Sequence, residues 1–401
     1  MKEIMRLIVL TVLALCQWHA DVAYADAEGL PSWLDNIQFH GFAAQSYLES
    51  NHNDFFGESE DGSFDFREIG LNTLWRITPD LQIAVQLLSR EAGETDDGDL
   101  RFDYAMIDYA VFNTDAGTSG IRIGRIMNPY GFYNDTRDIA ATRPSILLPQ
   151  SVYFDVNRNF ALSSDGAQFY SQTSVDSGFY SLQFHVFEPR MNDPDFEPAL
   201  LFMEAPGRFE GDDSWMARFI YEYDLGRIRL GLTAAQVNAE YHPGRNDFIG
   251  AGDFQFQPYL LSFQYNAERW SFTAEYAKRT VEIDRFVIAP DTEFTGTSYF
   301  IQGTYRVLDS WELLLRYDDL VWNDDDRNGK KFSAATGLPN YMRFAKDWTT
   351  GIRWDVNQYL MLRAEWHKVR GTGWLSLLEN PNSLALDEDW DLFAFLVSIR
   401  F

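Results

Sequence analysis

Apolar and polar residues alternate one by one along most of the chain, and no stripe of period 3.6 runs for the length of a helix. A period of two is typical of β-strands, whose successive side chains point to opposite faces. The alternation therefore predicts an all-β fold of about sixteen strands. They cover approximately 37–48, 64–77, 81–91, 101–113, 121–128, 166–175, 179–188, 214–224, 228–238, 254–265, 270–280, 296–307, 311–322, 347–356, 359–370 and 389–401.

The connections between these strands alternate in length. Tight turns lie at 78–80, 176–178, 225–227, 266–269, 308–310 and 357–358, with a slightly longer one at 115–120. Between them run long segments rich in Asp, Glu, Asn and Gly, such as 51–63, 189–213 and 323–346. A soluble sandwich has no reason to sort its connections in this way, whereas a transmembrane barrel has short periplasmic turns and long extracellular loops. The pattern predicts a transmembrane antiparallel β-barrel.

The two faces of the strands support a lipid-facing exterior. In strand 359–370 one face carries Leu360, Leu362 and Trp366, and the other carries Arg363 and Glu365. A charge on the lipid face at mid-bilayer costs about 2–4 kcal/mol, and the clearly alternating strands place none there. Aromatic residues form two belts, as expected where rings meet both membrane interfaces. The belts contain Trp75, Tyr180, Tyr223, Tyr265, Trp270, Trp311, Trp354 and Tyr359 beside the short turns, and Tyr47, Trp215, Tyr276, Tyr299, Tyr317 and Trp366 toward the long loops.

Composition narrows the possible classes of protein. The 401 residues include 60 acidic and 33 basic side chains, a net charge of −27, with 46% hydrophobic residues and one Cys. Such a chain is too apolar for a disordered polyacid and too poor in Cys for a disulfide scaffold. Its charge repels phosphate backbones, so we expect no nucleic-acid partner. No apolar run after residue 25 reaches the 18 residues that a spanning helix needs.

The first 25 residues indicate export. Lys2 and Arg6 precede an apolar run from Leu7 to Leu15, and Ala23-Tyr24-Ala25 offers a cleavage site. This is the layout of a secretory signal peptide, which we assign to residues 1–25. Residues 26–401 then form a single barrel domain without Cys, outside the cytoplasm.

The last strand carries a family resemblance. Residues 390–401 alternate and end on Phe401. With sixteen strands, the chain resembles the general or substrate-selective porins of Gram-negative outer membranes. The resemblance implies outer-membrane localisation and a passive diffusion channel for small hydrophilic solutes or ions. It also implies a homotrimer, contacts with outer-membrane lipid and lipopolysaccharide, and a role for Phe401 as the assembly signal that the barrel-assembly machinery reads.

The longest connection, approximately 128–165, follows the short fifth strand. In porins the third extracellular loop occupies this place and folds into the barrel to form the constriction. Many of its residues are too apolar for a loop in water, so they need a wall to pack on; an external lid over the barrel mouth is the alternative. Asn134 and Asp135 suggest a capped short helix through Thr142. The residues expected at the constriction are Asp135, Arg137, Asp138, Arg143, Asp155 and Arg158.

Inward-facing polar residues near mid-height are candidates for the pore lining. They are Glu68, Asn72, Gln86, Arg90, Asp108, Arg218, Glu275, Arg316, Arg363 and Glu365. Strict alternation turns the charged side chain of Arg125 outward, toward lipid. We expect a bulge or the end of the strand to change this direction. A ring of fixed charges sets the selectivity of a pore, which makes these residues the determinants of permeation.

No catalytic or cofactor motif is present. The chain lacks a phosphate-binding glycine loop, His-Glu-x-x-His and Gly-x-Ser-x-Gly, so we expect neither an enzyme nor a cofactor. Residues 324–329 imitate the start of a calcium loop, but Ala335 replaces the required Glu, and we expect no metal site. The alternative to a channel is a plugged, non-conducting barrel that serves as scaffold, adhesin or phage receptor.

Overall fold

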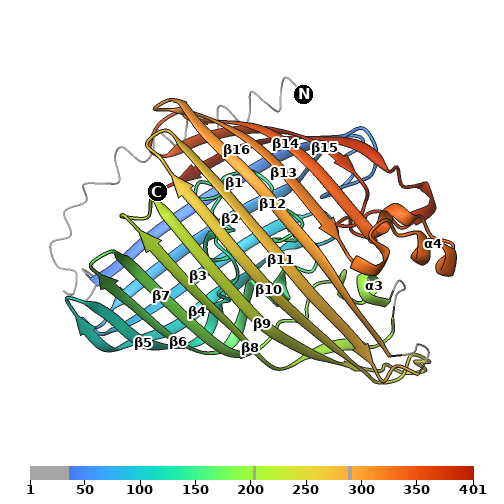
Figure 1. The fold of residues 1–401 in the computed structure, drawn as a ribbon, viewed down its shortest axis with the longest axis horizontal. Coiled ribbons are helices and arrows are strands. Elements are labelled where there is room, and N and C mark those ends of the chain that lie inside the picture. Colours follow the sequence, from blue (N-terminus) through green and yellow to red (C-terminus); the bar gives the residue numbers. More distant parts are fainter. Residues whose placement is uncertain (1–35, 202–204, 288–290) are drawn as a thin grey trace. The chain divides into compact units, whose positions relative to one another are not determined.

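A computed structural model describes residues 36–201, 205–287 and 291–401 (Figure 1). The compact unit Phe39–Phe401 contains a closed antiparallel barrel of sixteen strands, which confirms the predicted fold. The strands are β1 (Ile37–Ser50), β2 (Ser63–Arg76), β3 (Leu81–Ala92), β4 (Asp97–Thr114), β5 (Gly117–Met127), β6 (Ser163–Val175), β7 (Gly178–Glu188), β8 (Arg208–Tyr223), β9 (Ile228–His242), β10 (Gly252–Asn266), β11 (Trp270–Asp284), β12 (Thr292–Leu308), β13 (Trp311–Val321), β14 (Phe344–Asp355), β15 (Leu360–Arg370) and β16 (Asp389–Arg400). The predicted signal peptide lies outside the described residues.

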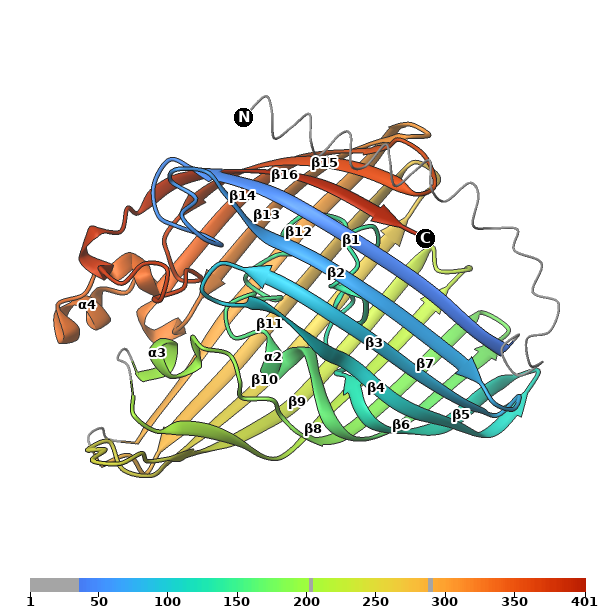
Figure 2. The ribbon, with the colours of Figure 1, turned by 180° about the vertical axis from the view of Figure 1, so that it is seen from behind.

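The barrel closes between the last and first strands. Strand β16 pairs antiparallel with β1, with Arg400 opposite Phe42 and Leu392 opposite Ser50. The other strands follow one another around the wall in sequence order, so their connections do not cross (Figures 1 and 2). Closure leaves no sheet edge with unpaired backbone groups, and a bilayer requires this.

Several strands extend farther than the alternation predicts. Strand β8 begins at Arg208 rather than 214, because a bulge between Asp212 and Trp215 interrupts the period of two. Strand β4 begins at Asp97 rather than 101, beyond two similar irregularities against β3. The turn predicted at 115–120 is tight, since β4 ends at Thr114 and β5 already begins at Gly117. Each bulge adds one residue, so the alternation of inward and outward side chains changes phase there. The residues beyond the bulge therefore do not continue the alternating pattern from which the strand was predicted.

The predicted sorting of connections is confirmed except between β3 and β4, where the connection at the long-connection end is only 93–96. Long connections lie at one end of the strands and carry α3 (Phe196–Leu201), α4 (Lys330–Thr336) and the 3₁₀ turns η3 (Asp324–Asp326), η4 (Asn340–Arg343) and η5 (Ser383–Ala385). Figure 1 shows α3 and α4 at this end, and the short turns lie at the opposite end. Among the described residues, no helix is long and apolar enough to cross a membrane.

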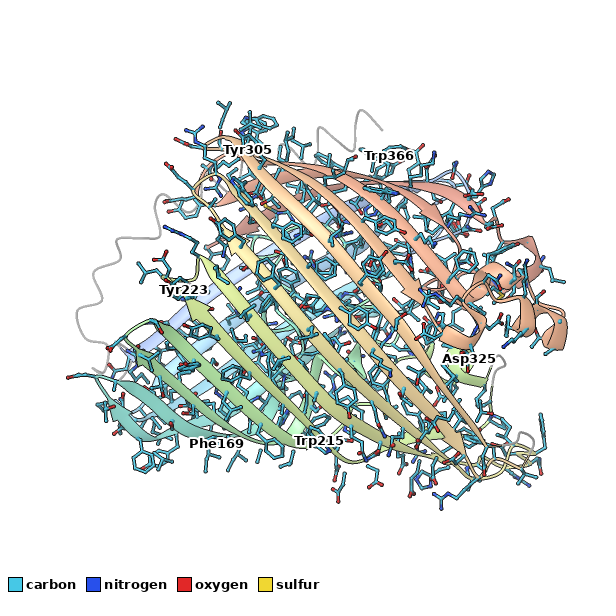
Figure 3. The ribbon with its side chains drawn as sticks, in the orientation of Figure 1. Phe169, Trp215, Tyr223, Tyr305, Asp325 and Trp366 are labelled. Carbon is cyan, nitrogen blue, oxygen red and sulfur yellow. The ribbon has the colours of Figure 1, made fainter. Side chains whose placement is uncertain are left out.

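The outward face of the barrel is apolar between two aromatic belts. Large exposed side chains include Leu71, Ile107, Ile123, Phe169, Leu232, Leu261, Ile301, Leu315 and Ile352. In Figure 3, Tyr223 and Tyr305 lie near the short turns, and Trp215 and Trp366 lie farther toward the long connections. Neighbouring belt rings stack, as Trp311 and Trp354 do with centroids 5.1 Å apart. A surface of this kind is typical of a lipid-facing barrel.

The buried core lies on the inward side of the strands. One cluster joins inward residues of β8–β12 with Tyr130, Val152 and Tyr153 of the connection between β5 and β6. The other joins inward residues of β1, β2, β15 and β16 with Ile146 and Leu147 of the same connection. This connection therefore packs on strands from distant parts of the wall.

Candidate functional site: the connection between β5 and β6 and the inward side chains

The connection runs from Asn128 to Leu162, because β5 ends at Met127 and β6 begins at Ser163. It contains one 3₁₀ turn, η2 (Asn134–Thr136), and a short helix, α2 (Asn159–Leu162). The predicted helix through Thr142 is wrong. The Asn134 side chain does not cap a helix but donates to the carbonyl oxygens of Asn128, Ala161 and Leu162, which ties the two ends of the connection together.

Most apolar residues of the connection are buried, as the sequence predicts, whereas Ile139 and Phe154 are half-buried. Tyr130, Phe132, Ile146, Leu147, Leu148, Val152 and Tyr153 are at most 8% exposed. Phe132 packs against Gly231 on β9, where a Cβ atom would come within 2.9 Å of its ring. Because the ring fits only over a glycine, this contact sets the height of the connection on β9.

A bidentate ion pair joins the connection to β2. Arg143 Nη1 and Nη2 donate to Glu68 Oε1 and Oε2 at 2.8 and 2.7 Å, and both side chains are at most 5% exposed. Arg143 Nη1 also donates to the carbonyl oxygen of Arg137. The planar fork of Arg matches a carboxylate in this way. The pair brings one predicted constriction residue and one predicted lining residue together.

A second ion pair lies on β8, several strands from β2. Arg218 Nη2 donates to Asp135 Oδ2 at 2.5 Å, and Arg218 Nη1 donates to the carbonyl oxygen of Gly131 at 2.7 Å. Arg218 is buried, whereas the Asp135 side chain is 42% exposed. Asp135 is thus the constriction candidate with the greatest access to solvent.

The remaining constriction candidates gather near β3 and β4. Arg90 on β3 and Arg137 both contact Asp155 Oδ1, at 3.0 and 3.2 Å, and Arg158 pairs with Asp138. All five side chains are buried. Arginine and aspartate alternate in this cluster, so each buried charge has an opposite charge beside it.

The strands β11, β13 and β15 hold the middle of the connection. Glu275 on β11 accepts from the Tyr153 hydroxyl and the Phe132 amide. Arg316 on β13 donates to the Leu147 carbonyl oxygen at 3.0 Å, and Glu365 on β15 accepts from the Ile146 amide at 2.6 Å. Arg363 on β15 donates to the Arg143 carbonyl oxygen at 3.0 Å.

The three other predicted lining residues have different partners. Asp108 on β4 pairs with Arg122 and accepts from the Tyr170 hydroxyl, and Gln86 on β3 donates to Asp103. Asn72 on β2 is half-buried, whereas the other nine predicted lining residues are buried.

Two groups that sequence reasoning did not single out as site residues belong to the same network. Arg353 on β14 donates to the Ala141 carbonyl oxygen, and His367 on β15 contacts Asp347 at 2.8 Å and Glu365 at 3.5 Å. All of these side chains share the inward parity of Arg363, so the alternation identifies their face. Which of these side chains pair with one another across strands cannot be predicted from neighbouring positions in the sequence.

Arg125 points outward, and the expected correction by a bulge or strand end is wrong. Its guanidinium pairs with outward-facing Asp165 on β6 at 2.8 Å, and the two side chains are 28% and 56% exposed. Both residues lie near the long-connection ends of their strands. An ion pair at headgroup height satisfies both charges without placing either at mid-bilayer.

The long connections also interlock with one another. Glu379 between β15 and β16 accepts from the amides of Phe56 and Gly57 between β1 and β2, and Ser376 donates to Asp195 beside α3. Burial raises the pKa of Glu379 to about 7 and that of Asp195 to about 6. These carboxyl groups thus take up protons near neutral pH.

No group of three or more His, Cys, Asp or Glu in the described part of the chain is arranged to hold a metal ion. In the calcium-like segment, Asp326 accepts from the amides of Lys331 and Phe332 and so caps α4. The Asp326 carboxylate thus accepts hydrogen bonds from free backbone amides in the first turn of α4.

Comparisons with known proteins define the fold. No family model matches the chain, and no curated protein matches it. The outer membrane channel DcaP of Acinetobacter baumannii is similar in structure, with a TM-score of 0.57 and 10% identity over 91% of this chain and 97% of that one. Salmonella typhi OmpF, in a complex with daunomycin, has a TM-score of 0.55 and 14% identity over 91% and 97%. The anion-selective porin of Comamonas acidovorans has a TM-score of 0.54 and 12% identity over 91% and 98%.

The architecture is therefore that of the outer-membrane porins, a closed barrel of sixteen antiparallel strands. The long connection after β5 and the inward charges that hold it are the features of this chain to which a function can be assigned.

Proposed function

We propose that the protein is an outer-membrane porin, a passive channel for small hydrophilic solutes or ions. The porin fold and the apolar exterior support this proposal, because a barrel of this size surrounds a lumen lined by every second residue of each strand. No chemical step is part of the proposal, and the protein acts without catalysis or cofactor.

The single observation that carries the proposal is the set of contacts made by the connection 128–162. Its partners come from strands on different sides of a closed ring: Glu68 on β2, Arg218 on β8, Glu275 on β11 and Glu365 on β15. A segment that touches inward side chains all around the wall narrows the lumen. We infer that Asp135, Arg137, Asp138, Arg143, Asp155 and Arg158 form the constriction, together with the ten inward lining residues.

Planar-bilayer recording of the purified protein tests the channel. We expect stepwise insertion of ohmic channels of small conductance, because the constriction is crowded by buried side chains. A barrel that inserts, as shown by antibody or mass photometry, and passes no current would overturn the proposal.

One observation favours a second candidate, the plugged barrel. Nine of the ten predicted lining residues are at most 5% exposed and contact protein rather than open space. A barrel filled in this way serves as a scaffold, adhesin or phage receptor. The same recording separates the two, because only the channel conducts.

We further propose a homotrimer in contact with lipid and lipopolysaccharide, assembled by the barrel-assembly machinery. The outward face of β1 carries Ala43, whose small side chain allows close approach of a neighbour, whereas Gly41 on the same face is covered by the Phe401 ring. Crosslinking in native membranes should give a trimer band, and monomer alone would contradict the proposal.

A further inference from the structure

A cavity of about 440 Å³ lies beneath the connection 128–162, where it meets the short-turn ends of β1, β2 and β16. A volume of this size suits a small molecule. The wall combines polar and apolar groups. Its principal residues are His40, Phe42, Asn72, Ile139, Thr142 and Arg400.

Arg400 and Arg76 differ from the other inward arginines near the short turns, because neither takes part in an ion pair among the described residues, and Arg400 is the one of the two that lines the cavity. Four others each pair with a carboxylate: Arg122 with Asp108, Arg229 with Glu222, Arg306 with Glu312 and Arg353 with Asp355. Arg400 is exposed, donates Nε to the Gln358 carbonyl oxygen at 3.1 Å, and takes part in no ion pair among the described residues. Its charge is available to a ligand.

Arg363 supplies a second cation without a carboxylate partner. It is 3% exposed, and its Nε and Nη1 have no hydrogen-bond partner among the described residues. Its neighbour across the strands is another cation, Arg353. A buried guanidinium in this position is costly unless an anion approaches it.

The connection brings Arg363 close to the cavity. Arg363 Nη2 donates to the carbonyl oxygen of Arg143, and the preceding residue, Thr142, lines the cavity. The guanidinium thus lies beside the cavity wall. Phe401 lies at the rim of the cavity, where its carbonyl oxygen accepts from the Gly41 amide. Among the described residues that line the cavity there is no Asp or Glu to offset the arginines.

We propose that the cavity binds a small organic carboxylate, with the carboxylate at Arg400 and the apolar body against Phe42 and Ile139. Arg363 adds a second positive charge on the side of the cavity that is next to the connection 128–162. The planar donor fork of Arg matches a carboxylate, and the apolar wall favours an aromatic or aliphatic body over an inorganic anion. The inference rests on the proposed channel function only in that the ligand is a solute that passes this site.

Calorimetric titration of the full-length protein in detergent tests the site with benzoate, inorganic phosphate and benzyl alcohol. We expect benzoate to bind, and Arg400→Gln to weaken it by at least about tenfold, because one charge-assisted contact is lost. Benzyl alcohol that binds as tightly as benzoate overturns the role of charge. Phosphate that binds as tightly overturns the role of the apolar wall.

Arg306→Gln is the matched control, because it removes the same charge from an inward arginine on β12 that does not line the cavity. Its affinity for benzoate should equal that of the wild type, and equal weakening in both variants overturns the site. Arg363→Gln should also weaken benzoate binding. If Arg363→Gln fails to fold, as judged by unchanged mobility on heating, Arg400→Gln alone decides.

Conductance separates this inference from the channel proposal. Benzoate binding to a barrel that passes no current supports the site and overturns the channel. Current without benzoate binding supports the channel and overturns the site.

Discussion

At the scale of single residues, arginines make the charged contacts by which the barrel wall and the long connection hold one another. Arg218, Arg316 and Arg363 on the strands each donate to a backbone carbonyl oxygen of the connection. From the connection, Arg143 pairs with Glu68 on β2. A buried ion pair contributes little net stability compared with apolar packing, but it strongly disfavours any geometry that separates its charges. These contacts therefore fix where the connection lies.

The pair of Arg143 and Glu68 gives a prediction of this kind. Arg143→Gln leaves the Glu68 carboxylate buried without a cation, and we expect a loss of about 3–5 kcal/mol in the free energy of unfolding. Guanidinium titration in detergent measures it. The double variant Arg143→Met with Glu68→Leu should recover most of the loss, since no charge remains buried. A double variant as unstable as the single one would contradict this account.

Phe401 allows a second prediction. Its ring covers Gly41 so closely that a Cβ there would come within 2.2 Å of the ring. Phe401→Ser should lower the amount of protein in outer membranes, measured by heat-dependent gel mobility of membrane fractions. Gly41→Ala is the control for packing, because it displaces the ring and keeps the terminal Phe. Normal levels for Phe401→Ser would remove the role of this residue in assembly.

At the scale of elements, the long connections form a layer held by buried carboxyl groups. Glu379 and Asp193 have pKa values raised to about 7, and Asp195 has one raised to about 6, in each case chiefly through burial. The ordinary pKa of such groups is about 4. The folded layer thus binds more protons than the unfolded one between about pH 4 and pH 7, so its stability increases as pH falls through this window.

Glu379 makes this pH dependence testable. We expect hydrogen exchange in segments 53–57 and 371–388, corrected for intrinsic rates, to be slower at pH 5.5 than at pH 8. Glu379→Gln should reduce the difference, because the amide keeps an oxygen acceptor for the Phe56 and Gly57 amides but does not titrate. Glu58→Gln, at an exposed position in the same connection, should leave it unchanged. Faster exchange at pH 5.5 in the wild type would show the opposite sign.

At the scale of the whole molecule, charge is distributed unevenly along the barrel. Acidic residues concentrate at the long-connection end, at 94–99, 193–197, 212–213, 324–326 and 387–389. The inward charges include Arg90, Arg218 and Arg316, offset by Asp108, Glu275 and Asp318. A negative vestibule above a balanced lumen raises the local concentration of cations.

We therefore predict a weak preference for cations that fades as salt rises. Screening lengths are about 10 Å at 0.1 M and about 3 Å at 1 M, so the vestibule acts only in dilute salt. Reversal potentials across a KCl gradient, measured at low and high salt, check this. Anion selectivity that persists at 1 M would show that the arginines of the constriction control permeation.

The sequence alone determined the strands, their number and the face of nearly every side chain, because the period of two is a local property of extended backbone. It also located the long connection and showed that its residues are too apolar to stay exposed to water, so that they must pack on another part of the protein. Where bulges shift the period, as before Trp215, the strand ends escaped detection.

Only the tertiary structure decided which charges meet. Glu68 and Arg143 are 75 residues apart, and Ile146 and Glu365 are 219 apart, so no local pattern pairs them. Asn134 forms no helix cap because the pairing of β5 with β6, which sets Met127 opposite Ser163, brings the two ends of the connection within reach of its amide. Arg125 finds its carboxylate on the outside, across a strand pair. Alternation assigns a side chain to a face, whereas its partner and its burial depend on how distant strands close into a ring.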